Sequence, residues 1–198
     1  MHNKPTIAVD IDEVLMPHFQ SLIDWYNPKY RTQLTLSHNH PSDPRPWGTP
    51  DYSEAVKRVH GFFNTPNFLN SRPFKEAVEA INTLSKNHKM IVVTGRDTII
   101  EDVTRAWLDK HFGELFAEAH FTARYNLDGN SRTKAEVCLK AGADYLVDDT
   151  IEDTLEAAAN GIQSLLFGDY PWNKSSKFPD GVIRLKNWQE VLEYFEKQ

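Results

Sequence analysis

The sequence holds a single cysteine, Cys138, among its 198 residues, so no disulfide bond can form within the chain. No apolar run approaches the ~20 residues that a membrane-spanning helix needs. The first residues, "MHNKPTIAVD", lack the hydrophobic segment of a secretory signal. These absences argue against a disulfide-stapled or membrane protein, and they predict a cytoplasmic one.

Positive charge is also scarce, because 22 lysines and arginines face 28 aspartates and glutamates, which gives a formal net charge of −6. Proteins that grip polymeric nucleic acid usually show the opposite balance. A pocket for a small phosphorylated molecule needs only local positive charge, so such a substrate stays open. The sequence gives no indication of the oligomeric state.

Short apolar, β-branched runs recur along the chain and predict six strands, at residues 7–11, 90–93, 119–122, 145–147, 163–167 and 182–185. Such runs suit a parallel sheet that is covered on both faces. Helical spacing lies between them, at residues 72–87, 97–112, 131–142, 151–161 and 187–198. This alternation predicts an α/β fold, a doubly wound, mostly parallel Rossmann-like sheet with right-handed crossovers.

The stretch 15–72 interrupts the alternation. It contains two helical patterns, "HFQSLIDWYN" and "DYSEAVKRVHGFFN", joined by the Pro- and His-rich "SHNHPSDPRPWGTPD". A chain of 198 residues suits one full core with a smaller unit attached. We therefore expect a core formed by residues 1–14 and 73–198, with residues 15–72 inserted after the first strand as a small helical cap.

Polar side chains gather where the predicted strands end. They are Asp10 and Asp12 after the first strand, Thr94, Gly95 and Arg96 after the second, Asp148 and Asp149 after the fourth, and Lys134 in the helix before it. Ligands of open α/β sheets bind at the carboxyl ends of the strands, so these residues are expected to converge. Carboxylate oxygens with a nearby lysine suit Mg²⁺ and a phosphate group.

Such a set can transfer a phosphoryl group. Asp10 would attack as the nucleophile and form an aspartyl-phosphate. Asp12 would protonate the leaving alkoxide and then deprotonate the attacking water. Thr94, Lys134 and the backbone N–H groups around Gly95 would hold the phosphoryl oxygens, and Mg²⁺ would neutralise the developing charge.

A plainer interpretation exists for each acidic pair. Asp10 and Asp12 also suit a turn after a strand, and Asp148 and Asp149 suit the N-cap of a following helix. The two pairs together, each after a buried strand, favour the catalytic interpretation.

In order and context, "DIDEVL", "VVTGR", Lys134 and "LVDD" resemble the four motifs of the haloacid-dehalogenase-like (HAD) phosphatases. Three further stretches, "FFNTPNFLNSRPFKEAVEAINTLSK", "KAEVCLKAGADYLVDD" and "LLFGDYPWNK", resemble the 5'(3')-deoxyribonucleotidase-like group within them. The resemblance implies Mg²⁺ held by the Asp10 side chain, the Asp12 backbone carbonyl and Asp148. Asp149 would contact a metal ligand, or would reach the metal through a water molecule. It also implies a cap that selects the substrate.

One residue departs from the resemblance. Many relatives carry glycine directly after the second aspartate, whereas this chain has Glu13, and glycine tolerates backbone shapes that glutamate does not. The candidates for selecting the substrate are Glu13, Phe19, Trp47, Phe62 and Arg96. The aromatic ones would touch a base or form the core of the cap. The "DYPWN" stretch has two interpretations: its side chains pack and shape the loop, or they contact the substrate.

The sequence thus predicts a Mg²⁺-dependent phosphomonoesterase that hydrolyses nucleoside (deoxy)monophosphates, its partner being this small substrate. Another small phosphate ester, such as a sugar phosphate or phosphoglycolate, would suit the same residues. A binding module with the same fold and no turnover is the alternative from another class. We expect His38 and His40 to lie in a solvated loop and Cys138 to be an inert core residue.

Overall fold

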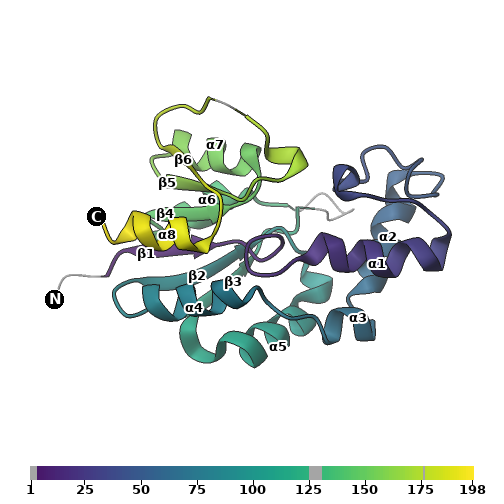
Figure 1. Ribbon diagram of the computed structural model, residues 1–198, viewed down its shortest axis with the longest axis horizontal. Coiled ribbons are helices and arrows are strands. Elements are labelled where there is room, and N and C mark those ends of the chain that lie inside the picture. The colour runs from purple at the N-terminus through teal and green to yellow at the C-terminus, as the bar shows by residue number, and fades with distance from the viewer. Residues whose placement is uncertain (1–3, 125–130, 176) are drawn as a thin grey trace.

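The computed structural model describes residues 4–124, 131–175 and 177–198, and it contains a six-stranded parallel sheet (Figure 1). The strands are β1 (Thr6–Val9), β2 (Lys89–Thr94), β3 (Glu118–Phe121), β4 (Tyr145–Asp148), β5 (Gln163–Phe167) and β6 (Val182–Leu185). Their order is β3-β2-β1-β4-β5-β6, so the winding reverses at β1. The predicted doubly wound sheet is confirmed. Residues 1–3, 125–130 and 176 of the predicted core lie outside the described residues.

Alternate residues of β1, β2 and β4 enter different hydrophobic clusters. Ile7 and Val9 belong to the larger cluster, and Ala8 between them belongs to the smaller one. Successive side chains of a strand point to opposite faces, so each face of the sheet packs against its own helices. The larger cluster takes in α4 (Lys75–Leu84), α5 (Glu101–Phe112) and α8 (Trp188–Phe195). The smaller takes in α6 (Lys134–Ala141) and α7 (Ile151–Ala159).

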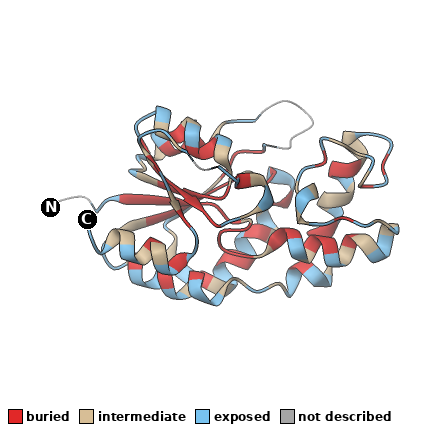
Figure 2. Cartoon of the chain, turned by 45° about the horizontal axis from the view of Figure 1, so that its top comes forward, coloured by how far each residue is buried: buried red, intermediate tan, exposed pale blue. Residues whose placement is uncertain are grey.

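Burial follows this layering. The inner strands β1, β2, β4 and β5 are largely buried, the edge strands β3 and β6 are partly exposed, and the helices expose their outer faces (Figure 2). A strand buried on both faces has no reason to alternate apolar with polar residues, which accounts for the continuous apolar runs in the sequence.

A group of short helices lies beside the sheet (Figure 1): α1 (His18–Tyr30), the 3₁₀ helix η1 (Leu36–His38), α2 (Tyr52–Phe62) and α3 (Pro66–Leu69). We call residues 15–72 the cap, and these bounds stay a prediction. The two chain crossings into the cap are bonded to each other, because Phe74 N–H donates to Leu15 O at 2.9 Å. The indole N–H of Trp188 donates to Val14 O, also at 2.9 Å, and joins the first crossing to α8.

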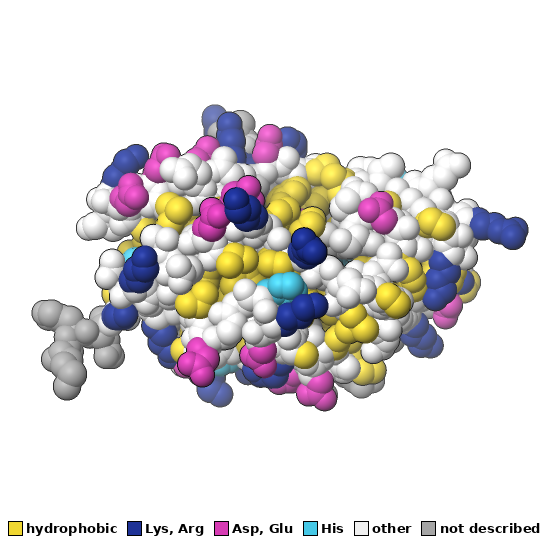
Figure 3. All heavy atoms as spheres, turned by 60° about the horizontal axis from the view of Figure 1, so that its bottom comes forward, with side chains coloured by type: hydrophobic (Ala, Val, Ile, Leu, Met, Phe, Trp, Pro, Cys, Tyr) yellow, Lys and Arg dark blue, Asp and Glu magenta, His cyan; other side chains and the backbone are white. Residues whose placement is uncertain are grey.

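Among the described residues, no helix is both long and apolar enough to cross a bilayer. The surface is mixed in character. On the face drawn in Figure 3, hydrophobic side chains gather near the middle, and lysines and arginines lie around them.

Candidate active site

The sheet register brings the predicted acidic residues together. Val9 of β1 lies opposite Val92 of β2 and Val147 of β4, so the residues that follow these positions share one edge of the sheet. Asp10 N–H continues the ladder by donating to Val147 O at 3.0 Å. Asp148, the last residue of β4, therefore lies beside Asp10, as the strand-end argument predicts.

Lys134 joins these two carboxylates. Its Nζ lies 2.6 Å from Asp148 Oδ2 and 3.1 Å from Asp10 Oδ2, and all three side chains are buried. Burial raises the pKa of Asp10 to about 7, against the opposing effect of the Lys134 charge. Burial alone would lower the pKa of Lys134, but Asp10 and Asp148 raise it well above its usual value. Lys134 is thus a buried cation in the position predicted for phosphate binding.

Asp149 completes a group of three carboxylates that suits a divalent cation. Asp10, Asp148 and Asp149 each offer an oxygen, and these atoms lie within 4.8 Å of one another. Asp10 Oδ1 is buried and has no hydrogen-bond partner among the described residues. Hard carboxylate oxygens are the ligands that Mg²⁺ prefers, and the charge of a cation would offset the repulsion among them. The residues present therefore fit the predicted metal.

Asp12 is held by Arg96 rather than by Lys134. Arg96 lies two residues after the end of β2. Its Nη2 and Nε donate to Asp12 Oδ1 and Oδ2 at 2.6 Å and 3.1 Å, respectively. Its Nη1 donates to Thr104 Oγ1 at 3.1 Å. Although burial opposes the charged form, the Arg96 guanidinium holds the pKa of Asp12 below its usual value. Arg96 was a candidate for substrate selection, and the structure places it against the predicted acid/base.

Arg96 also reaches the cap. Its guanidinium lies 5.0 Å from the ring centre of Phe63, directly after α2, and 5.1 Å from that of Phe68 in α3. Its side chain is only 2% exposed. One buried arginine thus contacts Asp12 after β1, Thr104 of α5, and the cap.

His18, the first residue of α1, is a site residue that the sequence did not reveal. Its Nδ1 lies 3.4 Å from Asp12 Oδ1, and its ring stacks on Phe63 with centres 5.2 Å apart. Burial lowers the pKa of His18 to about 4, so the ring is neutral near pH 7. The only signal was its place six residues after Asp12, at the start of a predicted cap helix.

Glu13 adopts the left-handed backbone conformation, with φ 60°, which glycine adopts with less steric strain. The conformation costs a non-glycine residue roughly 1 kcal/mol. The side chain compensates, because Glu13 Oε1 accepts a hydrogen bond from Phe19 N–H in the first turn of α1 at 2.6 Å. Burial, with the charges of Asp12 and Asp149, raises its pKa well above the usual value. Glu13 therefore ties the turn after β1 to the first helix of the cap.

Thr94 and Gly95 lie at the edge of the same site. Thr94 is fully buried, and its Oγ1 accepts a hydrogen bond from Arg96 N–H at 3.3 Å. Gly95 lines the cavity above the carboxylates. Their predicted contact with phosphate stays a prediction.

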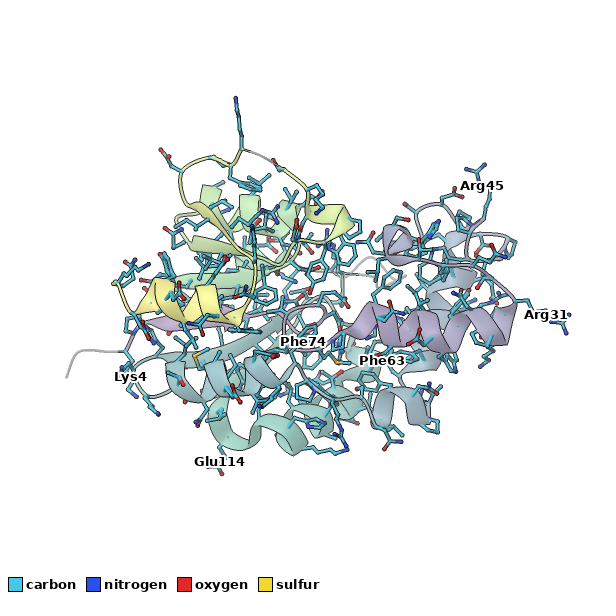
Figure 4. The ribbon with its side chains drawn as sticks, in the orientation of Figure 1. Lys4, Arg31, Arg45, Phe63, Phe74 and Glu114 are labelled. Carbon is cyan, nitrogen blue, oxygen red and sulfur yellow. The ribbon has the colours of Figure 1, made fainter. Side chains whose placement is uncertain are left out.

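A cavity of about 480 Å³ extends from the carboxylates between the cap and the core. Its aromatic lining comprises Phe19, Trp47, Phe63 and Trp172. Phe62, a candidate for base contact, is instead fully buried among the cap aromatics, and its neighbour Phe63 lines the cavity. Figure 4 shows Phe63 beside α1 where the cap meets the core, whereas Arg31 and Arg45 point outward at the far end of the cap.

The remaining predicted residues lie apart from the carboxylate group. His38 Nδ1 accepts a hydrogen bond from Thr35 N–H at 3.0 Å. His40 is exposed and lines the cavity with its ring 5.9 Å from that of Tyr52. Cys138 is fully buried, and burial raises its pKa to about 12, so it is an unreactive core residue as expected.

Residues 4–197 match the protein family described as "5' nucleotidase, deoxy (Pyrimidine), cytosolic type C protein". The match includes every site residue described above. The chain belongs to this family. The description of this family names the reaction class that the four motifs predict.

Individual proteins are also similar to this nucleotidase-family chain in sequence or in fold. "Putative nucleotidase YqfW" of Bacillus subtilis (strain 168) is 25% identical over 121 residues, which is 61% of this chain, and the chain spans only 58% of that protein. The haloacid dehalogenase-like family protein SP0104 from Streptococcus pneumoniae shares the fold with a TM-score of 0.70 at 18% identity, over 98% of this chain and 100% of that one. The HAD-hydrolase YfnB from Bacillus subtilis, described as bound to magnesium, gives 0.65 at 10% identity, over 98% and 99%.

Proposed function

We propose that the protein is a Mg²⁺-dependent phosphomonoesterase that hydrolyses nucleoside monophosphates with Asp10 as its nucleophile. The observation that carries this proposal is the Asp10 carboxylate. Its Oδ1 is buried without a partner among the described residues, and its Oδ2 lies 3.1 Å from Lys134 Nζ. Family membership supports the reaction class.

The residues suit two consecutive displacements. Asp10 attacks phosphorus, the bond from phosphorus to the ester oxygen breaks, and Asp12 gives that oxygen a proton. Water then attacks the aspartyl-phosphate, Asp12 takes the proton of the water, and phosphate leaves. Mg²⁺ held by Asp10, the Asp12 carbonyl, Asp148 and Asp149 would offset the charge on the phosphoryl oxygens. Lys134 supplies positive charge beside the same oxygens.

The contact between Arg96 and Asp12 affects the two proton transfers differently. Arg96 favours the ionised form of Asp12, which suits the step in which Asp12 accepts a proton from water. Donation to the leaving group requires a protonated Asp12, which the pair opposes. The hydrogen bonds between Arg96 and Asp12 therefore weaken in the first step.

The aromatic lining favours a nucleotide over the other phosphate esters. Phe19, Trp47 and Phe63 line the cavity but are at most 4% exposed. Trp172 is partly exposed and offers its ring to a planar group. A base can stack on such rings, whereas a sugar phosphate or phosphoglycolate lacks a ring system of that kind. The base and sugar preference depends on contacts made only when substrate is bound.

The test is phosphate release from a panel of ribo- and deoxynucleoside 5'- and 3'-monophosphates, several sugar phosphates and phosphoglycolate. Each is assayed with Mg²⁺ and with chelator, beside the Asp10→Asn variant. We expect release that requires both Mg²⁺ and Asp10 and is fastest for nucleotides. Preference for a sugar phosphate would keep the mechanism and reject the substrate, and normal turnover by Asp10→Asn would reject the nucleophile.

A further inference from the structure

The loop after β5, "GDYPWNK" at residues 168–174, is built around two stacked rings. Tyr170 and Trp172 lie parallel, with an interplanar angle of 2° and ring centres 4.8 Å apart. Gly168 has φ +80°, and a Cβ there would lie 2.3 Å from Tyr170 Cε2. The loop therefore needs glycine at this position to seat the rings.

Buried polar contacts fix the loop to the sheet. The side chain of Asn173 is fully buried and donates to Phe167 O and to Asp149 O, each at 2.9 Å. Arg184 of β6 donates to Gly168 O at 2.6 Å and also to the Asn173 carbonyl. A loop with these anchors holds its rings in one place.

Each stacked ring sends one hydrogen bond into the site. Trp172 Nε1–H donates to Asp149 Oδ2 at 2.7 Å, and Tyr170 O–H donates to Glu13 O at 2.6 Å. The indole N–H is a donor only, and it carries no charge. It therefore holds one oxygen of Asp149 without neutralising the carboxylate, which stays available to a cation.

Trp172 is also part of the cavity. Its ring meets that of Phe19 edge to face, at 6.4 Å and 88°. One side chain thus contacts both the carboxylate group and the aromatic lining.

We propose that Trp172 is a positioning residue for the metal centre: its indole N–H orients the Asp149 carboxylate toward a divalent cation. The proposal rests on the metal dependence proposed above. Groups that orient a metal-binding residue typically contribute about 10–100-fold to metal affinity. Trp172 acts through Asp149 and takes no direct part in the reaction.

The experiment measures Mn²⁺ affinity by titration with electron paramagnetic resonance detection of free Mn²⁺, without substrate. Trp172→Phe keeps a ring in the stack and removes only the N–H. Tyr170→Phe is the matched control, because it removes a hydrogen bond from the partner ring in the same loop. We expect Trp172→Phe to weaken Mn²⁺ binding about 10-fold and Tyr170→Phe to leave it near wild type. Excess metal should restore most of the kcat of Trp172→Phe.

A second background separates positioning from loop damage. In Asp149→Asn protein, the further change Trp172→Phe should have little additional effect on Mn²⁺ affinity, because both act on one carboxylate. Unchanged affinity in Trp172→Phe, or equal losses in both single loop variants, would overturn the proposal while leaving the metal-dependent function intact. A wild-type protein that binds no Mn²⁺ would instead overturn the metal dependence, and this proposal with it.

Discussion

At the scale of single residues, the pairing of Arg96 with Asp12 is the contact that most affects the proposed chemistry. The arginine uses its fork on both carboxylate oxygens and on Thr104, while Phe63 and Phe68 lie against its guanidinium. Lysine carries the same charge but cannot reproduce a two-point contact. The orientation of Asp12 thus depends on the shape of the Arg96 side chain as well as on its charge.

We predict that Arg96→Lys lowers kcat about 100-fold with little change in KM, because a carboxylate displaced by about 1 Å loses its reactive geometry. The measurement is steady-state kinetics on the best substrate of the panel, with circular dichroism as the folding check. Arg105→Lys is the matched control, since Arg105 pairs with Glu101 on the partly exposed side of α5. A kcat for Arg96→Lys equal to that of the control would contradict the assignment.

The sequence predicts some of these residues and not others, and the reason is physical. Asp10 follows β1 and Asp148 ends β4, so the parallel register alone brings these two together. Lys134 reaches them from the first turn of α6. The contact between Arg96 and Asp12 joins residues 84 positions apart, and His18 reaches Asp12 only because α1 folds back over the turn. Local patterns carry no record of how a cap is placed on a core.

At the scale of elements, α6 carries the buried lysine on its first turn. Thr133 is the N-cap, and its Oγ1 accepts from Glu136 N–H at 3.2 Å, while Glu136 Oε2 accepts from Thr133 N–H at 3.0 Å. This reciprocal capping fixes the start of the helix. Lys134, the next residue, therefore enters the site at a defined angle.

We predict that Thr133→Ala lowers the free energy of unfolding by about 1 kcal/mol and raises KM several-fold. Asn187→Ala, which removes the N-cap of α8 on the opposite face of the sheet from α6, should cost similar stability without changing KM. Urea unfolding and steady-state kinetics on both variants provide the comparison. If both variants raise KM equally, the effect comes from general loss of stability and not from the placement of Lys134.

Element boundaries show where sequence patterns lose resolution. The predicted helix 97–112 begins as the 3₁₀ turn η2 (Thr98–Ile100) and becomes α5 at Glu101. Asp97 caps it by accepting from Ile99 N–H at 3.2 Å. A 3₁₀ turn and a first α-turn share the same capping residues, so the sequence shows the start of the element but not its type.

At the scale of the whole molecule, the acidic site is a cost to the fold. Three buried carboxylates face one buried lysine in a chain of net charge −6. The pKa of Asp10, raised to about 7 by burial, measures part of this cost. Sites built for a ligand commonly lower stability until the ligand binds.

We predict that, in chelator at pH 8, Asp10→Asn is more stable than wild type by about 2–4 kcal/mol. The folded pKa of Asp10 lies above the unfolded one, so its contribution to stability is full below pH about 4 and is lost as pH rises through about 7. The advantage of Asp10→Asn should therefore shrink steadily below pH about 7 and vanish near pH 4. The measurement is chemical unfolding at both pH values.

Mg²⁺ provides the control for the same variant. At 100 times its dissociation constant, the metal should stabilise wild type by about 2.7 kcal/mol and Asp10→Asn much less. An Asp10→Asn protein that is less stable than wild type in chelator at pH 8 would show that the charge of Asp10 is not a burden on the fold.

The central place of β1 in the sheet has a consequence for how the protein unfolds. β1 is bonded to β2 on one side and to β4 on the other, whereas β3 and β6 form the edges. Amide groups of a central strand exchange with solvent only in the largest opening events, and peripheral helices open more readily. The cap can thus detach in partial unfolding while the turn that carries Asp10 remains in the last surviving unit, so the reactive carboxylates disperse only when the whole sheet melts.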